Sequence, residues 1–255
     1  IIFYLQKFDE DGLNDMLHTV VQGPPGVGKT ELGRILSKIY LAMGILKNDK
    51  FIIAKRSDLI GKYLGHTATQ TQKVIDSAKG GVLFIDEAYS LGNPEGRDMF
   101  SKECLDTLNQ NLTENKKNLL CIIAGYKEAL DSCFFSYNEG LSRRFSIRYT
   151  IEPYTPSELK EIFIKIVESN KWTVADNLEL KYFSENKEFF KYYGGDMETL
   201  FFSSKVVHAR RVFCLDTEEK KKITNDDLKN AIEIFKKNKG VEKNLKNEMW
   251  KNLYI

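Results

Sequence analysis

The fold is decided by one stretch, Gly23-Pro24-Pro25-Gly26-Val27-Gly28-Lys29-Thr30, which matches the pattern GxxxxGK[ST]. An apolar run precedes it and a helical pattern follows it, which is the context that a phosphate-binding loop requires. Glycines allow backbone N–H groups to turn towards phosphates, and the helix N-terminus adds the positive end of its dipole. We expect the whole stretch to cradle a nucleotide, with Lys29 at the β- and γ-phosphates and the Thr30 hydroxyl on Mg²⁺. A Gly-Pro-rich turn without a ligand is the alternative, and the flanking strand and helix argue against it.

A second motif supplies the acids that such a site needs. The apolar run Val82–Ile85 is typical of a buried strand, and it ends in Asp86 and Glu87. Because a hard cation prefers oxygen ligands, we expect Asp86 to hold Mg²⁺ through water, and we expect Glu87 to act as the general base that polarises the attacking water. Two acids at the tip of a strand could also be solvated turn residues. The two motifs together nevertheless predict that the chain binds ATP with Mg²⁺ and hydrolyses it.

The first part of the chain alternates short apolar runs with helical patterns, which predicts an α/β domain over residues 1–152 with a parallel sheet flanked by helices. The expected sheet has five strands, near residues 17–22, 51–54, 82–85, 119–124 and 145–149. The expected helices lie near residues 29–46, 67–78, 98–112 and 127–134.

After Pro153 the pattern becomes helical throughout, which predicts a small all-α lid domain over residues 153–240. A capping box with proline at the first helical position, Thr155-Pro156-Ser157-Glu158, marks the first helix. Further helices are expected near residues 181–193, 196–213 and 225–237. Residues 241–255 are rich in lysine and are predicted to form a basic C-terminal tail. The lysine run is a solvated helix end or a flexible tail, and an interaction patch is the alternative.

Composition limits the partners and the location of the chain. A formal net charge of +2 over 255 residues gives no global basic field, which argues against nucleic acid as the partner. The four cysteines form no CxxC pair, and no apolar run approaches the about 18–20 residues that span a bilayer. The opening residues lack a signal-peptide pattern, so we expect a cytoplasmic protein without a membrane segment. The first residue is not Met, which is consistent with a trimmed piece of a longer protein.

Three further features point beyond an ordinary phosphate-loop enzyme. They are a glycine-flanked loop with an aromatic tip (residues 58–65), the segment NEGLSRRF (residues 138–145) and the helical region that follows. Together they resemble an AAA+ module of the CbxX/CfqX type, a family that includes red-type Rubisco activases and type VII secretion ATPases. The matching segments are GPPGVGKT, DLIGKYLGHTATQT, GGVLFIDEAYSL, CIIAGY and NEGLSRRF. Within the family, the chain looks most like members from large DNA viruses and protists.

The resemblance implies roles for further residues. Lys62, Tyr63 and Leu64 match the loop that grips a polypeptide in the central pore of a ring, although Tyr63 could also pack on its own domain. Arg144 matches the arginine that reaches a neighbour's ATP, although it could also be a surface arginine paired with an acid. Tyr126 falls at the position that senses nucleotide, where a core tyrosine is the other interpretation. A homo-oligomeric, six-membered ring acting on a polypeptide client is therefore expected.

Two departures from the family pattern matter. The family commonly has arginine at the position of Ser142, so Arg143 either shares the role of Arg144 or has none. Many AAA+ proteins also carry a sensor arginine early in the third lid helix, where this chain reads GGDME (residues 194–198).

His18, His66 and His208 stand apart from other metal-binding residues, which argues against zinc.

The favoured hypothesis is thus an ATP-driven motor that remodels or threads a protein client. The alternative is a DNA-handling AAA+ protein of the initiator or clamp-loader type, which would need a basic DNA-facing surface or an added domain. A scaffold that binds ATP without hydrolysing it is a third reading, and the intact Asp86–Glu87 pair argues against it.

Overall fold

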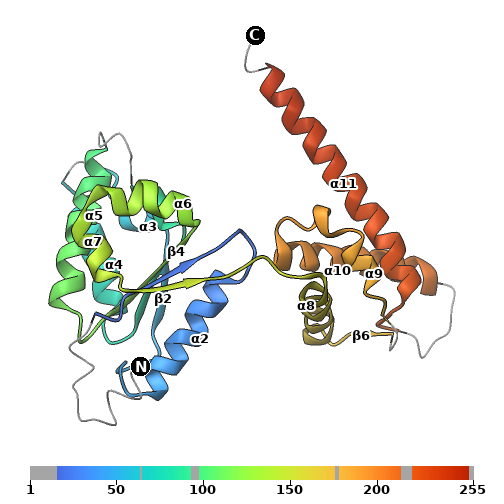
Figure 1. Ribbon diagram of the computed structural model, residues 1–255, viewed down its shortest axis with the longest axis horizontal. Coiled ribbons are helices and arrows are strands. Elements are labelled where there is room, and N and C mark those ends of the chain that lie inside the picture. The colour runs from blue at the N-terminus through green and yellow to red at the C-terminus, as the bar shows by residue number, and fades with distance from the viewer. Residues whose placement is uncertain (1–15, 64, 93–97, 176–177, 214–219, 253–255) are drawn as a thin grey trace. The chain divides into compact units, whose positions relative to one another are not determined.

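The computed structural model describes residues 16–63, 65–92, 98–175, 178–213 and 220–252 (Figure 1). The chain divides into two compact units. The sheet unit is built on the residues up to Glu152, and the helical unit is built on Pro153 onwards together with Pro25–Val27. Each unit is described by itself below.

Five parallel strands form the centre of the sheet unit, in the order β2-β3-β4-β1-β5. Their bounds are β1 Thr19–Gln22, β2 Phe51–Ala54, β3 Val82–Ile85, β4 Leu120–Gly125 and β5 Ile147–Thr150. The sequence therefore predicted all five strands, and it placed β2 and β3 without error because their apolar runs are sharply bounded. The predicted start of β1 and both predicted ends of β4 and β5 differ from the observed bounds, whereas the end of β1 at Gln22 is confirmed.

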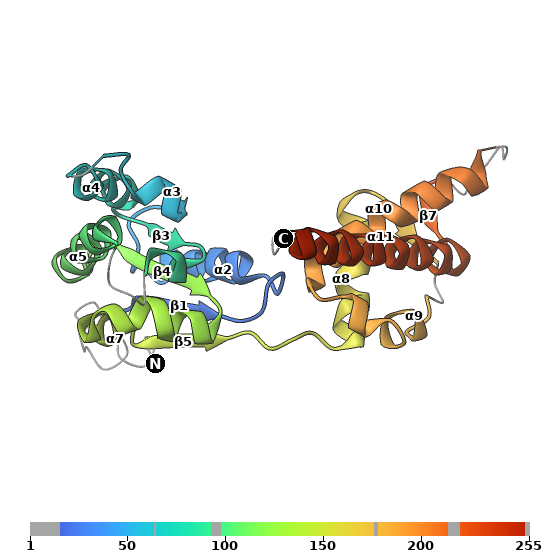
Figure 2. The ribbon, with the colours of Figure 1, turned by 90° about the horizontal axis from the view of Figure 1, so that it is seen from above.

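Alternate residues of the central strands β1, β3 and β4 face two separate hydrophobic layers. In β3, Leu83 and Ile85 contribute to one layer, whereas Val82 and Phe84 contribute to the other. The helices α4, α5 and α7 cover the first layer, and α2 covers the second (Figure 2). A Cβ atom at Gly33 of α2 would lie 2.6 Å from the Phe84 ring, so this glycine allows α2 to approach the sheet closely.

The helices and turns of the sheet unit differ from the predictions mainly in the connections. Helix α2 ends at Ala42 rather than near residue 46, and Gly44, with φ of 72°, turns the chain away. The predicted helix over 127–134 is a short α6 that continues as a π-helical turn. The elements are α2 Lys29–Ala42, α3 Arg56–Leu59, α4 Thr67–Ala78, η2 Ala88–Leu91, α5 Met99–Glu114, α6 Lys127–Ala129, η3 Leu130–Phe134, η4 Phe135–Tyr137 and α7 Glu139–Arg144.

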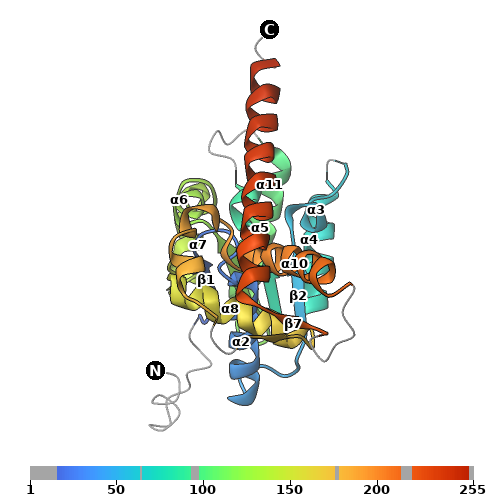
Figure 3. The ribbon, with the colours of Figure 1, turned by 90° about the vertical axis from the view of Figure 1, so that its right-hand side faces the viewer.

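The helical unit packs around a core rich in phenylalanine. Its elements are α8 Pro156–Ser169, β6 Thr173–Val174, α9 Lys181–Ser184, η5 Lys187–Phe189, α10 Tyr193–Val212, β7 Lys222–Ile223 and α11 Asn225–Asn252. Helix α8 begins with the predicted capping box, since the Thr155 and Glu158 side chains each bond the other's backbone N–H. The core includes Phe163, Phe183 and Phe235, all buried. Helices α10 and α11 cross one another in this unit (Figure 3).

Three features of the helical unit differ from the sequence prediction. The helix predicted over 181–193 is interrupted, because the buried Asn186 donates to the Tyr182 carbonyl and ends the first turn. Strands β6 and β7 pair in parallel, which adds a short ladder to the helices. Helix α11 continues to Asn252 instead of ending near residue 237, so the region expected as a tail is helical there. Lysine, glutamate and leucine favour helix, and Gly240 alone does not end it.

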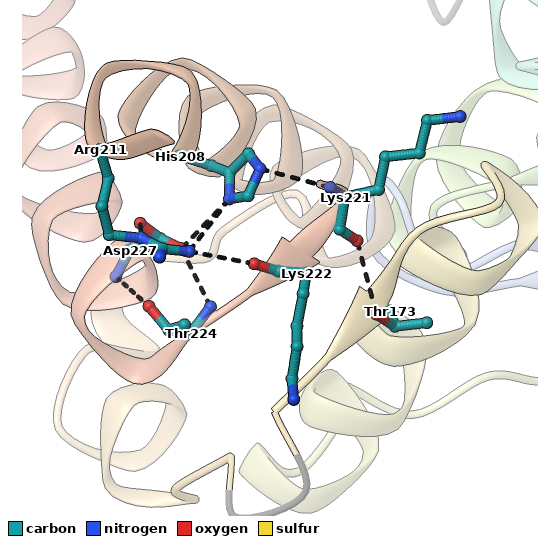
Figure 4. A network of polar contacts seen from close by, with 7 residues as sticks. All are labelled: Thr173, His208, Arg211, Lys221, Lys222, Thr224 and Asp227. Atoms are coloured by element: carbon teal, nitrogen blue, oxygen red, sulfur yellow. Dashed lines mark hydrogen bonds and ion pairs between the residues drawn. The ribbon is translucent and has the colours of Figure 1, made fainter. Parts of the chain in front are cut away.

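A buried carboxylate fastens the end of α10 to the start of α11 (Figure 4). Asp227 accepts two hydrogen bonds from Arg211, both of 3.0 Å, and one of 3.0 Å from the Thr224 backbone N–H. His208 Nδ1 lies 3.6 Å from the same carboxylate. Burial alone would raise the pKa of Asp227, but the hydrogen bonds from Arg211 and Thr224 hold it below its ordinary value.

Candidate nucleotide site

Three adjacent strands bring the predicted nucleotide-binding residues to one edge of the sheet. The phosphate-binding loop follows β1, Tyr126 follows β4, and Asp86 follows β3, and these strands are neighbours in the order β3-β4-β1. Carboxyl ends of parallel strands lie at the same edge, which is where α/β sheets bind ligands. The Gly23 N–H donates to the Gly125 carbonyl at 3.2 Å and fixes the start of the loop against β4.

The loop uses glycine where the backbone demands it. Gly26 and Gly28 have φ of 75° and 83°, in the left-handed region that side chains with a Cβ atom rarely adopt. Gly28 is the N-cap of α2, and α2 begins at Lys29 as the sequence predicted. The first backbone N–H groups of α2 therefore open onto the loop, which is the arrangement that binds anions at a helix N-terminus. Thr30 lies in this first turn, half-buried.

The Lys29 side chain points into the phosphate-binding loop and lies beside Tyr126. Its ammonium donates to the carbonyl oxygens of Gly23 (2.9 Å) and Pro24 (2.7 Å), and it lies 5.3 Å from the centre of the Tyr126 ring. Burial lowers the pKa of Lys29, and the charges of Asp86 and Glu87 oppose that shift. The cation and the two carboxylates thus share one site, although they come from different loops.

Asp86 and Glu87 are held by the turn that ends β3. The Asp86 N–H donates to the Ala54 carbonyl at 3.0 Å, and the Asp86 carboxylate accepts from the Glu87 N–H at 3.1 Å. Glu87 is exposed and has φ of 52°, a conformation that costs a residue other than glycine about 1–3 kcal/mol. Such strain is concentrated at functional sites. The oxygen donors of Thr30 and Asp86 are the kind that Mg²⁺ prefers, so the residues present fit this ion.

Tyr89 belongs to the site and was missed in the sequence. Its ring stacks on the Tyr126 ring with 5.5 Å between the centres, and Gly125 makes room, because a Cβ atom there would lie 2.9 Å from Tyr89. Burial first, and then the negative charge of Glu87 and a hydrogen bond with it, raise the pKa of Tyr89 to about 12. The aromatic residue two positions after Glu87 was the signal that could have revealed it.

The loop predicted to contact a polypeptide presents its tyrosine to solvent. Tyr63 is 68% exposed, and its ring makes an edge-to-face contact with the His66 ring, with 5.6 Å between the centres. Lys62 is also exposed, whereas Leu64 lies outside the described residues. The base of the loop is fixed, since the Gly61 N–H donates to Thr67 Oγ1 at 3.2 Å. The loop therefore displays an aromatic side chain from an anchored base.

The two candidate arginines differ in their surroundings. Arg144, the last residue of α7, donates from Nε to Thr113 Oγ1 (2.7 Å) and from Nη1 to the Gly140 carbonyl (2.8 Å). Arg143 is exposed and has no hydrogen-bond or ion-pair partner among the described residues. Ser142, where the family commonly has arginine, accepts a hydrogen bond of 3.3 Å from Arg148. Within the described part of the chain, no ion pair joins Arg144 to an acid.

The start of α10 contains a buried acid. Many AAA+ proteins carry a sensor arginine at this place, and this chain does not. Asp196 accepts from the Tyr192 N–H at 2.7 Å and pairs with Lys239 at 2.9 Å. Arg211, further along the same helix, is bound to Asp227. These residues have structural partners inside the helical unit.

His18, which the sequence placed inside the first strand, lies just before β1 and links two elements. Its Nδ1 accepts from the Cys121 N–H at 3.1 Å, so its Nε2–H donates to the Leu112 carbonyl at 2.9 Å. Burial lowers the pKa of His18. In the part of the chain that the structure describes, no three His, Cys, Asp or Glu side chains gather as a metal site, and no helix is long and apolar enough to cross a membrane.

Comparison with known proteins identifies the family of the chain. The model of the ATPase family associated with various cellular activities (AAA) matches residues 19–153, more than half of the chain. A cfxQ-like protein of Acanthamoeba polyphaga mimivirus is 47% identical over 242 residues, which are 93% of this chain and 59% of that protein. The stage V sporulation protein K of Bacillus subtilis is 38% identical over 183 residues, 71% of this chain and 56% of that protein.

One further comparison covers a shorter part of this chain, and another concerns a more distant protein. The ESX-3 secretion system protein EccA3 of Mycolicibacterium smegmatis is 41% identical over 151 residues, 59% of this chain and 25% of that protein. The crystal structure of the FIGL-1 AAA domain superposes with a TM-score of 0.60 at 21% identity, covering 85% of this chain and 70% of that one. This likeness concerns the fold alone. The chain spans only part of the length of each of these relatives.

Proposed function

Because this chain belongs to the AAA family of ATPases and resembles its CfxQ-like members, we propose that it hydrolyses ATP with Mg²⁺, as one subunit of a ring, to remodel or thread a polypeptide. One observation carries the proposal. It is that Lys29, which follows β1, interacts electrostatically with Asp86 and Glu87, which follow β3 on the other side of β4. An exposed aromatic loop elsewhere on the same unit supports the proposal.

Each residue of the site has a chemical role in this proposal. The N–H groups of the loop and of the first turn of α2 bind the phosphates, and Lys29 exchanges its carbonyl partners for phosphate oxygens. Thr30 and Asp86 hold Mg²⁺, which supplies charge neutralisation at the phosphates. Glu87 accepts a proton from the attacking water. Tyr126, stacked on Tyr89, holds its ring beside the Lys29 ammonium and helps to orient it.

We infer the ring of subunits because hydrolysis needs a further cation at the γ-phosphate, which a neighbouring subunit can supply. We propose that Arg144 supplies it to the neighbouring subunit, with Arg143 beside it as a second candidate. Arg144 must then leave Thr113 and the Gly140 carbonyl, and the loss of these two hydrogen bonds to neutral groups is a small cost beside the stabilisation of phosphate charge. A six-membered ring is the number implied by the resemblance.

A polypeptide client is favoured over DNA by the loop and by the charge. An aromatic side chain offers a large contact area at a low cost in conformational entropy, so Tyr63 can grip many sequences. A DNA-handling protein would carry a basic stripe, but the formal net charge is +2.

The decisive experiment mixes two inactive variants. Arg144→Ala should lower ATP turnover by about 10³–10⁵, as loss of an arginine finger does. A Glu87→Gln subunit still carries Arg144, so adding it to Arg144→Ala subunits should restore turnover at the mixed interfaces. The specific activity of the unaltered chain should also rise with protein concentration, because each site is completed by a neighbour.

Two controls accompany the mixture. Thr113→Val removes the side-chain partner of Arg144 inside its own chain, keeps the Gly140 carbonyl as its other partner, and should leave turnover within a few-fold of the unaltered chain. Arg143→Ala tests the neighbouring arginine in the same way. Activity that does not depend on concentration, with no recovery in the mixture, would show that the chain works without a ring.

A further inference from the structure

A cavity of about 500 Å³ lies beside the loop that carries Tyr63. One wall is a face of α4, on which Gln70 and Lys73 follow His66 at helical spacing. The other wall is the loop itself, with Lys62 and Tyr63. The cavity is separate from the nucleotide site, which lies around Lys29 and Glu87.

The cavity is positively charged. Lys62 and Lys73 line it, and none of the described residues that line it is acidic. Neither ammonium has a hydrogen-bond or ion-pair partner within the described part of the chain. The nearest acids along the chain are engaged elsewhere, since Asp58 accepts from the Lys55 N–H at 2.8 Å and Asp76 pairs with Lys79 at 2.7 Å. The ammonium groups of Lys62 and Lys73 therefore line one cavity without a negatively charged partner.

The cavity is already formed before any ligand arrives. The Thr71 hydroxyl donates to the Leu59 carbonyl at 2.9 Å, and this bond is buried. On the loop side, a Cβ atom at Gly61 would lie 2.7 Å from the carbonyl carbon of His66, so only glycine allows the loop to lie so close to α4. Because the walls are fixed, a ligand does not have to order them when it binds.

We propose that this cavity binds acidic segments of the client polypeptide, with client carboxylates paired to Lys62 and Lys73 and the Tyr63 ring packed on the chain between them. The inference rests on the proposed function, in which Tyr63 grips a client. It further specifies that the client segment bound beside Tyr63 is negatively charged. Tyr63 supplies affinity that does not depend on the sequence of the client, and the two lysines supply the preference for acidic segments.

Carboxylates fit this cavity better than nucleic-acid phosphates do. Proteins that hold a single strand line a long groove with cations and stack successive bases on several aromatic rings. Here two lysines flank one cavity, and Tyr63 and His66 stand edge to face rather than as parallel platforms. Such a pair of exposed cations suits side chains that project at intervals from an extended peptide.

The test compares labelled peptides of about 20 residues that differ only in carrying Glu, Gln or Lys at alternate positions. Binding to the full chain carrying Glu87→Gln is measured by fluorescence anisotropy with Mg²⁺ and ATP. The Glu peptide should bind about tenfold more tightly than the Gln peptide, and the Lys peptide should bind most weakly. The differences should shrink between about 50 and 200 mM salt, because exposed charges are screened.

Substitutions locate the effect. Lys73→Gln should weaken the Glu peptide about two- to fivefold, the usual contribution of an exposed charge pair, and should leave the Gln peptide unchanged. Lys79→Gln is the matched control, because Lys79 follows α4 but is paired with Asp76 and does not line the cavity. It should change neither affinity.

The possible failures are distinct. Equal binding of the Glu and Gln peptides, both weakened by Tyr63→Ala, would overturn the charge preference and leave the proposed function standing. Absence of any binding that depends on Tyr63 would overturn the proposed function as well. A single-stranded DNA of matched charge that displaces the Glu peptide and depends on Lys73 would make the cavity a nucleic-acid site.

Discussion

One group of charged side chains in the helical unit and one in the sheet unit have opposite surroundings. In the helical unit, the Asp227 side chain is 1% exposed and is held by Arg211 and Thr224 (Figure 4). In the sheet unit, Lys73 and Arg143 are exposed and have no partner among the described residues. A buried charge must be paired or it destabilises the fold, whereas an exposed charge without a partner contributes little to stability and remains available to a ligand. We therefore expect stability to depend on the first group and activity on the second.

The largest expected effect is on turnover in the sheet unit. Glu87→Gln should lower ATP turnover by about 10²–10⁴, the contribution of a positioned general base, while nucleotide binding is kept. Steady-state hydrolysis and binding of a fluorescent ATP analogue measure the two quantities separately. Glu128→Gln, another exposed carboxylate near the end of β4, is the control. Hydrolysis by Glu87→Gln at the rate of the unaltered chain would remove Glu87 from its role.

The second effect is on stability in the helical unit. Asp227→Asn should lower the free energy of unfolding by about 3–5 kcal/mol, the range for a broken buried ion pair, and we expect the lower end because the Arg211 side chain stays 28% exposed. Trp172 packs on His208 at 5.0 Å, so its fluorescence in a Trp250→Phe background reports unfolding of this unit by urea.

Asp226→Asn is the matched control, because Asp226 lies in the same first turn of α11 and is exposed. It should leave the urea midpoint nearly unchanged. Equal midpoints for the two variants would show that the buried network contributes nothing, and the contrast between the two units would then be wrong.

The smallest effect concerns His18, a buried titratable group of the sheet unit. Since burial lowers the pKa of His18 in the folded chain, the unfolded chain binds the proton more readily. The stability contributed by the neutral ring is complete above pH 6.5 and falls as the pH drops below that value, by at most about 1.4 kcal/mol per pH unit. Protonation of Nδ1 would also remove the acceptor of the Cys121 N–H.

Amide hydrogen exchange at Cys121, compared at about pH 5.5 and 7.5 after correction for the intrinsic rate, measures this effect in the sheet unit alone. His18→Gln should reduce the difference between the two pH values. An unchanged difference in that variant would assign the acid sensitivity to another group.

The sequence predicted those parts of the fold whose signals are local. The loop at 23–30, the start of α2 at Lys29 and the whole of α4 follow from glycine positions and helical periodicity within a few residues. The strands β2 and β3 follow from apolar runs with clear ends. The carboxylates Asp86 and Glu87 were likewise found because they end such a run.

Only the tertiary structure decided which distant residues meet. The stack of Tyr89 on Tyr126 beside Lys29 joins three strand ends, and no pattern within one segment encodes the order of strands in the sheet. The bond between Arg144 and Thr113 and the ion pair between Arg211 and Asp227 also join separate helices. The cavity beside Tyr63 exists because Gly61 lets the loop lie against α4. Such contacts depend on packing between elements, whereas the motifs depend on the conformation and chemistry of neighbouring residues, which the sequence states directly.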